Sequence, residues 1–123
     1  MLEYSNRQET SMAIKEFDMT IYNLQAEISK TLSHPLRLAL LHILKDGEKT
    51  VTELVDIIGA SQSNISQHLA LMRQRQIVKT RKKGSSVYYQ VANPKISQAC
   101  DTMREVLMEQ LSQKQEIAKI YSK

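Results

Sequence analysis

A run of uncharged polar side chains between residues 59 and 72 has the chemistry needed to read the edges of nucleic-acid bases. GASQSNISQHLALM contains no Asp, Glu, Lys or Arg. On a helix, at about 100° per residue, Ile65, Leu69 and Met72 share one face. The side chains opposite them or in the first turn include Gln62, Ser63, Asn64, Ser66 and Gln67. Gln and Asn can pair bidentately with adenine and Ser can donate or accept, although all three are middling or poor helix formers. The pattern predicts a base-reading face.

Six basic side chains follow this helix within eleven residues, and no acidic residue interrupts them. They are Arg73, Arg75, Lys79, Arg81, Lys82 and Lys83. The whole chain has a net charge of only +4, so the placement of the charge says more than its total. Arg81, Lys82 and Lys83 fall at the tip of an expected hairpin, where they are predicted to contact phosphates in or along a minor groove. The alternative is a solvated basic loop.

Two short helices and a hairpin are expected to position these residues. Residues from about 50 to 58 form one helix, Gly59 ends it, and Ser61 is a good N-cap for the next. A three-residue turn containing Gly between two helices is typical of a helix-turn-helix, here at about 50–73. Residues 77–81 and 87–91 are β-rich and flank KKGSS, which predicts a wing at about 77–92. The expected fold is mainly α with a small β-hairpin, a winged helix-turn-helix.

Both ends of the chain carry apolar stripes at helical spacing. We expect dimerisation helices at about 12–30 and 94–121, after a flexible segment at 1–11, within a single domain at 12–121. The predicted interface residues are Ile14, Phe17, Ile21 and Leu24, together with Ile96, Cys100, Met103, Leu107 and Leu111. The alternative for the first helix is that it docks onto its own domain. The fold is therefore expected to be dimeric through its N- and C-terminal helices.

The composition excludes several classes of protein. The chain has 123 residues and one cysteine, so no disulfide forms within it. No signal peptide and no membrane-spanning apolar stretch are visible, and we expect a cytoplasmic protein. No Gly-rich phosphate loop, nucleophile elbow or paired carboxylates are present, so we predict that the protein is not an enzyme.

Three segments together resemble the ArsR/SmtB family of bacterial and archaeal winged-helix repressors. They are LSHPLRLALLHIL at 32–44, TVTELVDIIGASQSNISQHLALMRQRQIV at 50–78, and RKKGSSVYYQV at 81–91. The resemblance implies a homodimer whose two reading helices enter successive major grooves of a partly palindromic double-stranded DNA operator. It implies that Gln62, Ser63, Ser66 and Gln67 read bases. It also implies that His68 reaches a phosphate or braces the helix, with a partly buried packing role as the alternative.

The sequence departs from the family pattern at the positions where family members sense the signal that releases them from DNA, and at the end of the reading helix. A Glu-Leu-Cys-x-Cys metal site is replaced by ELVDI at 53–57, and an Asp-x-His site by DTM at 101–103, so we predict no metal and no cofactor. Cys100 lacks a second cysteine, which leaves redox sensing or a buried apolar role open. The small effector is unknown. Gln76 stands where many relatives have Gly at the end of the reading helix.

A protein-interaction module without operator binding is the alternative function.

Overall fold

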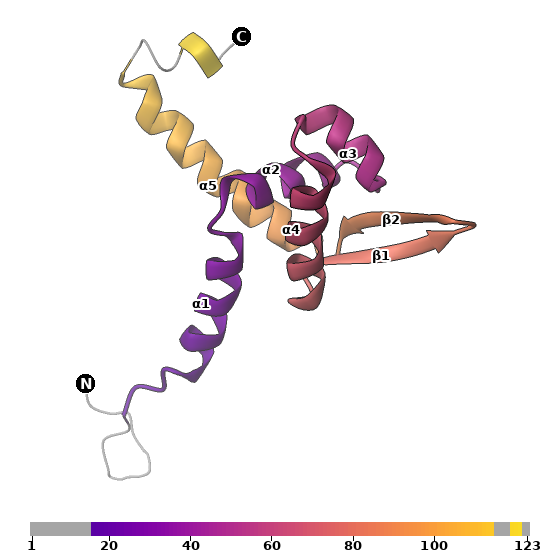
Figure 1. The fold of residues 1–123 in the computed structure, drawn as a ribbon. Helices are drawn as coiled ribbons and strands as arrows, with labels where there is room; N and C mark the ends of the chain where they lie inside the picture. The colour runs from indigo at the N-terminus through magenta and orange to yellow at the C-terminus, as the bar shows by residue number, and fades with distance from the viewer. Residues whose placement is uncertain (1–15, 115–118, 122–123) are drawn as a thin grey trace. The chain divides into compact units, whose positions relative to one another are not determined.

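The computed structural model describes residues 16–114 and 119–121, in which five helices and one hairpin follow each other along the chain (Figure 1). In order they are α1 (Thr20–Leu32), α2 (Pro35–Leu44), α3 (Val51–Ile58), α4 (Gln62–Gln74), β1 (Val78–Lys83), β2 (Ser86–Val91) and α5 (Pro94–Ser112). The predicted fold class, mainly α with a small antiparallel hairpin, is confirmed. Among the described residues, 16–30 and those from Thr31 onward belong to separate compact units.

The core of the second unit is small and built from aliphatic side chains of α2, α3, α4 and β1. Its buried members are Leu40, Leu41, Leu44, Leu54, Ile65, Leu69, Met72, Ile77 and Val78. The predicted inward face of α4 is confirmed, because Ile65, Leu69 and Met72 have no exposed surface. One apolar stripe thus holds α4 to the core of the protein.

Local capping interactions define the turn between α3 and α4. Thr50 and Glu53 form a reciprocal capping box at the start of α3, and Gly59 ends that helix with a left-handed φ of 83°. Ser61 Oγ then accepts a hydrogen bond from the Asn64 amide at 3.2 Å and begins α4. The turn between the two helices is therefore specified by short-range contacts.

The wing is a regular antiparallel hairpin that is tied to the loop before α3. Lys83 pairs with Ser86 across a two-residue turn in which Gly84 has a φ of 61°. At the other end of the hairpin, the Lys49 and Tyr89 amides each donate to the carbonyl of the other residue, at 3.0 and 2.8 Å. This bridge joins the wing to the helix-turn-helix through the backbone.

Gln76 closes α4 in the left-handed backbone conformation that favours glycine. Its φ is 63°, and its amide donates to the Arg73 carbonyl at 3.0 Å. The Ile77 amide donates to the Met72 carbonyl at 2.8 Å, which completes a Schellman cap. The left-handed backbone conformation costs a residue other than glycine roughly 1 kcal/mol. Burial of Ile77 just after the turn helps to hold this conformation.

The terminal helices are shorter than predicted. α1 begins at Thr20 rather than near residue 12, because Met19 and Asp18 cap it: the Asn23 amide donates to the Met19 carbonyl, and the Thr20 amide donates to the Asp18 carboxylate. Phe17 therefore precedes the helix, and Ile14 lies outside the described residues. α5 ends at Ser112, and a further helical turn is described at 119–121. None of the helices that the structure describes has the length and apolarity needed to cross a membrane.

Candidate nucleic-acid interface

The exposed face of α4 carries the side chains predicted to read bases. Gln62, Ser63, Asn64 and Gln67 are exposed and Ser66 is half-buried, all pointing away from the apolar stripe that faces the core. The hydroxyls of Ser61 and Ser63 lie 3.5 Å apart at the start of the helix. The face thus presents amide and hydroxyl groups and no carboxylate that would repel phosphates.

His68 lies on a different side of α4 and faces α2. Its Nδ1 accepts a hydrogen bond from Arg37 Nε at 3.0 Å, and its ring lies 4.3 Å from that of His34. Arg37 also donates to the Thr31 carbonyl at 2.9 Å, so it joins the recognition helix to the segment that enters α2. The structure places the His68 side chain in a bracing contact, while its predicted contact with DNA stays a prediction.

The partial burial of His68 is expected to make the stability of the protein depend on pH below neutrality. Burial lowers the pKa of His68 below its usual value, and the neighbouring His34 and Arg37 lower it further. In the unfolded chain the pKa of a histidine is about 6.5, so below that pH the unfolded state binds a proton that the folded state resists. We expect the free energy of unfolding to be highest above about pH 6.5 and to fall as the solution is acidified.

The measurement is urea unfolding between pH 5 and 8, for the wild type and for His68→Gln. Glutamine can accept the Arg37 hydrogen bond but does not titrate, so the variant should lose less stability on acidification. Equal losses in the two proteins would show that His68 does not cause this part of the pH dependence.

Arg81, one of the three predicted wing cations, is engaged within the protein. Its Nε donates to Glu48 Oε1 at 3.0 Å, and its Nη2 donates to Glu48 Oε2. The guanidinium also lies 5.1 Å from the centre of the Tyr88 ring. The hydrogen bond lowers the pKa of Glu48 and raises that of Arg81. Sequence reasoning missed Glu48 because it lies on a separate loop, 33 residues away.

Lys82 and Lys83 end β1, and both side chains are exposed at the tip of the wing. Among the described residues, no hydrogen bond or ion pair occupies their ammonium groups, although Lys83 is close enough to Glu48 to lower its pKa. They are the wing cations that are available to phosphates. Arg73 is a further exposed cation, on the same face of α4 as Gln62 and Ser66.

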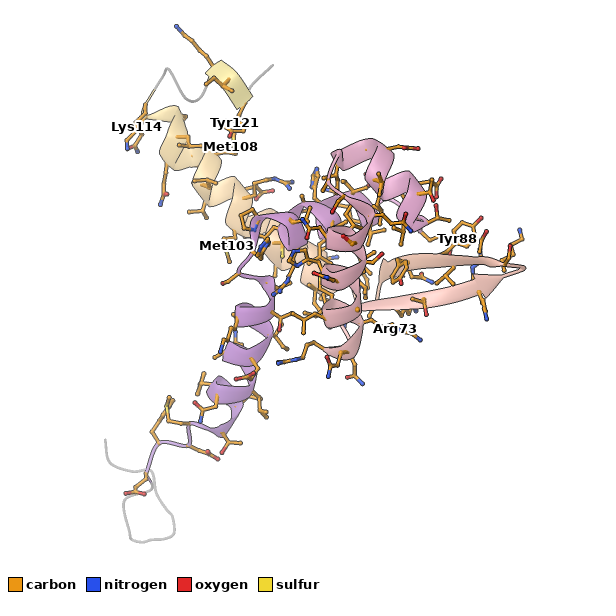
Figure 2. All side chains as sticks on the ribbon, viewed as in Figure 1. Arg73, Tyr88, Met103, Met108, Lys114 and Tyr121 are labelled. Atoms are coloured by element: carbon orange, nitrogen blue, oxygen red, sulfur yellow. The ribbon has the colours of Figure 1, made fainter. Side chains whose placement is uncertain are left out.

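The predicted interface stripe on α5 divides into two parts. Ile96 and Cys100 pack against the core of their own chain, and burial raises the pKa of the Cys100 thiol. Further along the helix, Met103 is 72% exposed, Leu107 is 48% exposed, and Leu111 is half-buried. Figure 2 shows Met103 and Met108 on the part of α5 that leads away from the hairpin.

On α1, Ile21 and Leu24 are exposed. Phe17, which precedes that helix, is also exposed, and its ring stacks on that of Tyr22 with 5.3 Å between the centroids. The predicted interface role of these residues is not tested by their positions within a single chain.

Polar contacts around Asp101 join α5 to α2 and to Lys45, which caps the end of α2. Asp101 accepts from Lys45 Nζ and from Arg104 Nη2, both at 3.2 Å. Arg104 Nη1 also lies 2.6 Å from His42 Nδ1. In the part of the chain that the structure describes, no group of three His, Cys, Asp or Glu side chains has the arrangement of a metal site.

Comparison of the sequence with known proteins gives consistent matches. The model of the arsR family of bacterial regulatory proteins matches residues 34–80. The chain is 37% identical over 93 residues to the uncharacterized HTH-type transcriptional regulator Rv0081 of Mycobacterium tuberculosis. The matched region covers 75% of this chain and 82% of that protein. It is 36% identical over 91 residues to a biofilm growth-associated repressor of Xylella fastidiosa, covering 74% and 80% of the two chains.

Solved structures show the same architecture. The crystal structure of Mycobacterium tuberculosis Rv0081 matches with a TM-score of 0.68 and 36% identity, over 76% of this chain and 95% of that one. The homodimeric winged helix-turn-helix DNA-binding domain Mb0332 of Mycobacterium bovis matches with a TM-score of 0.70, over 80% and 93% of the two chains. At 23% identity this second match shows the fold alone, which is the predicted winged helix-turn-helix.

Proposed function

Because this chain belongs to the arsR family of bacterial regulatory proteins, we propose that it binds a partly palindromic operator as a homodimer and represses transcription there. The family makes it a DNA-binding transcriptional regulator and not an enzyme. We further propose that it acts in the cytoplasm, where a bacterial operator is found, and that a signal which is still unidentified releases it from DNA.

The observation that carries this proposal is the division of α4 into two faces. Ile65, Leu69 and Met72 are fully buried, and the opposite side exposes neutral amides and hydroxyls. A helix that is anchored on one side and uncharged on the other fits into a major groove without repelling the phosphates. The exposed cations Lys82 and Lys83 at the wing tip support contact with the adjacent backbone.

Exposed apolar side chains support the homodimer. Met103, Val106 and Leu107 are exposed on α5, and Ile21 and Leu24 are exposed on α1. A soluble chain gains by covering such stripes, and a second copy presents the same stripes. The Mb0332 domain, which has this fold, is a homodimer. In a two-fold dimer the two reading helices would lie about one turn of DNA apart, which predicts an operator with two related half-sites.

The test of the proposed function is selection of bound duplexes from a random DNA pool, followed by titration of a recovered duplex at two salt concentrations. We expect two inverted half-sites in the recovered sequences and a steep loss of affinity with salt, because phosphate contacts release counterions. A protein-interaction module would bind weakly at both salt concentrations and enrich no sequence.

Replacing Gln67 with alanine should reduce the discrimination between operator and unrelated DNA. The loss of a bidentate base contact is worth about 1–3 kcal/mol on the selected duplex and less on unrelated DNA. The matched control is Lys83→Ala, which should weaken both duplexes alike and flatten the salt dependence, because Lys83 is expected to contact phosphate. Titration of each variant against both duplexes gives the ratio of its affinities for the operator and for unrelated DNA. An unchanged ratio for Gln67→Ala would remove Gln67 from the reading face.

A further inference from the structure

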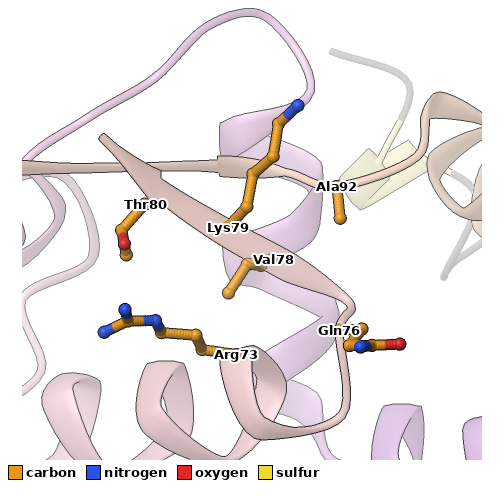
Figure 3. Close-up of a pocket in the computed structure, with 6 residues that line it drawn as sticks. All are labelled: Arg73, Gln76, Val78, Lys79, Thr80 and Ala92. Carbon is orange, nitrogen blue, oxygen red and sulfur yellow. The ribbon is translucent and has the colours of Figure 1, made fainter.

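An open hollow lies between the C-terminal end of α4 and the base of the wing. Its volume is about 330 Å³, and it is lined by Arg73, Gln76, Val78, Lys79, Thr80 and Ala92 (Figure 3). No acidic side chain contributes to the lining. The hollow is therefore an electropositive space between the two elements that are proposed to enter DNA grooves.

Arg73 connects this hollow to the reading face. It follows Ser66 by seven residues and Gln62 by eleven, which is about two and three turns of helix, so the three side chains lie on one side of α4. Arg73 is exposed, and among the described residues no hydrogen bond or ion pair engages its guanidinium. Arg81, by contrast, is bound to Glu48. Arg73 thus retains all of its donors for a ligand.

Thr80 faces the same space from the strand. Side chains alternate along β1, so Val78 and Thr80 lie on one face and Lys79 lies on the other. Figure 3 shows the Thr80 side chain and the Arg73 guanidinium on the same side of β1, with Lys79 pointing away from them. Val78 is buried and closes the floor of the hollow. A guanidinium and a hydroxyl therefore both line the hollow on one side of β1.

We propose that Arg73 and Thr80 clamp a phosphate of the DNA strand that passes between the major and minor grooves. When α4 occupies a major groove and the wing follows the adjacent minor groove, the sugar-phosphate backbone separating the grooves must run between these two elements. The hollow is the space that they leave between them. Guanidinium and hydroxyl groups are common phosphate ligands in protein–DNA complexes. This inference rests on the proposed function and adds a contact site to it.

The test compares Arg73→Gln with Arg75→Gln on a random-sequence duplex over a range of salt concentrations. Arg75 is the matched control because it is also an exposed arginine and lies two residues further on, about 200° around the helix axis. We expect Arg73→Gln to lower affinity about tenfold at low salt and to reduce the salt slope by about one unit per protomer. Arg75→Gln should change both quantities less. Equal effects of the two substitutions would overturn the clamp.

Two further variants separate charge from position. Arg73→Lys keeps the charge and should restore most of the salt slope, and Thr80→Val removes only the hydroxyl and should weaken binding a few-fold with the slope unchanged. Thermal unfolding of each variant confirms that it is folded before titration. If Thr80→Val binds like the wild type, the hydroxyl takes no part in the clamp and the proposal is wrong in that respect.

Duplexes carrying one neutral methylphosphonate at successive positions locate the contact on the DNA backbone. We expect one position per half-site at which this change weakens the wild type but not Arg73→Gln. If the two proteins respond alike at every position, the clamp is refuted while operator binding stands. If the wild type itself shows no salt-dependent binding to any duplex, the proposed function fails, and the clamp fails with it.

Discussion

Replacing Leu107 with glutamate should separate the proposed homodimer into monomers and reduce affinity for the proposed operator by about a hundredfold or more. Leu107 is 48% exposed on α5, next to the exposed side chains of Met103 and Val106. A carboxylate buried in an apolar interface without a partner loses its hydration, so the dimer is strongly disfavoured. Each monomer would then bind one half-site and lose the gain from joining two sites in one assembly.

The matched control is Gln98→Glu, which adds the same charge on the opposite side of the same helix. Residues 98 and 107 are nine positions apart, about 180° around the helix axis. Sedimentation at several protein concentrations should show monomers for Leu107→Glu and dimers for Gln98→Glu, and the operator titration should follow the same order. If Leu107→Glu sediments like the wild type, the dimer interface lies elsewhere.

Periodicity predicted the two faces of α4 because its apolar stripe packs on the core while most of its polar side chains remain exposed. Every apolar side chain at helical spacing from Ile65 to Met72 meets the core, and every intervening polar side chain except His68 points elsewhere. The hairpin was equally predictable, since its β-rich runs and its Gly84 turn act over short distances. In both cases the local signal and the tertiary environment agree.

The stripe on α5 shows what periodicity cannot resolve. The same spacing runs from Ile96 through Leu111, yet Ile96 and Cys100 pack on the core of their own chain while Met103 and Leu107 remain exposed. α5 packs on its own chain only where it lies beside α2 and β2, and its apolar side chains beyond that point stay exposed. That boundary arises from the tertiary fold and leaves no mark in the sequence of the helix.

The contacts that Arg81 and His68 make within the chain have the same origin. Arg81 is predicted to contact phosphate, and the Lys49–Tyr89 bridge brings Glu48 beside it. Arg37, 31 residues earlier in the chain, holds His68 in the bracing contact that was one of its two predicted roles. Charge and spacing along the sequence identify groups that can bind phosphate, whereas contacts between distant segments decide which of them remain available.

Replacing Leu69 with alanine should lower the free energy of unfolding by about 2–5 kcal/mol. Leu69 has no exposed surface and is the middle of the three α4 side chains that hold the recognition helix to the core. The substitution removes buried methyl groups and leaves a cavity that rigid neighbours fill only in part. Because a small domain is stable by only about 5–15 kcal/mol, this is a large share of the total.

Urea unfolding of Leu69→Ala and Leu71→Ala separates the anchoring of α4 from a general loss of helix packing. Leu71 lies on the same helix and is half-buried, so the same chemical change should cost clearly less there. Operator affinity should fall more for Leu69→Ala than for Leu71→Ala, because a loosened helix must be reordered on DNA. Equal losses of stability in the two variants would mean that the buried stripe is not what holds the reading face in place.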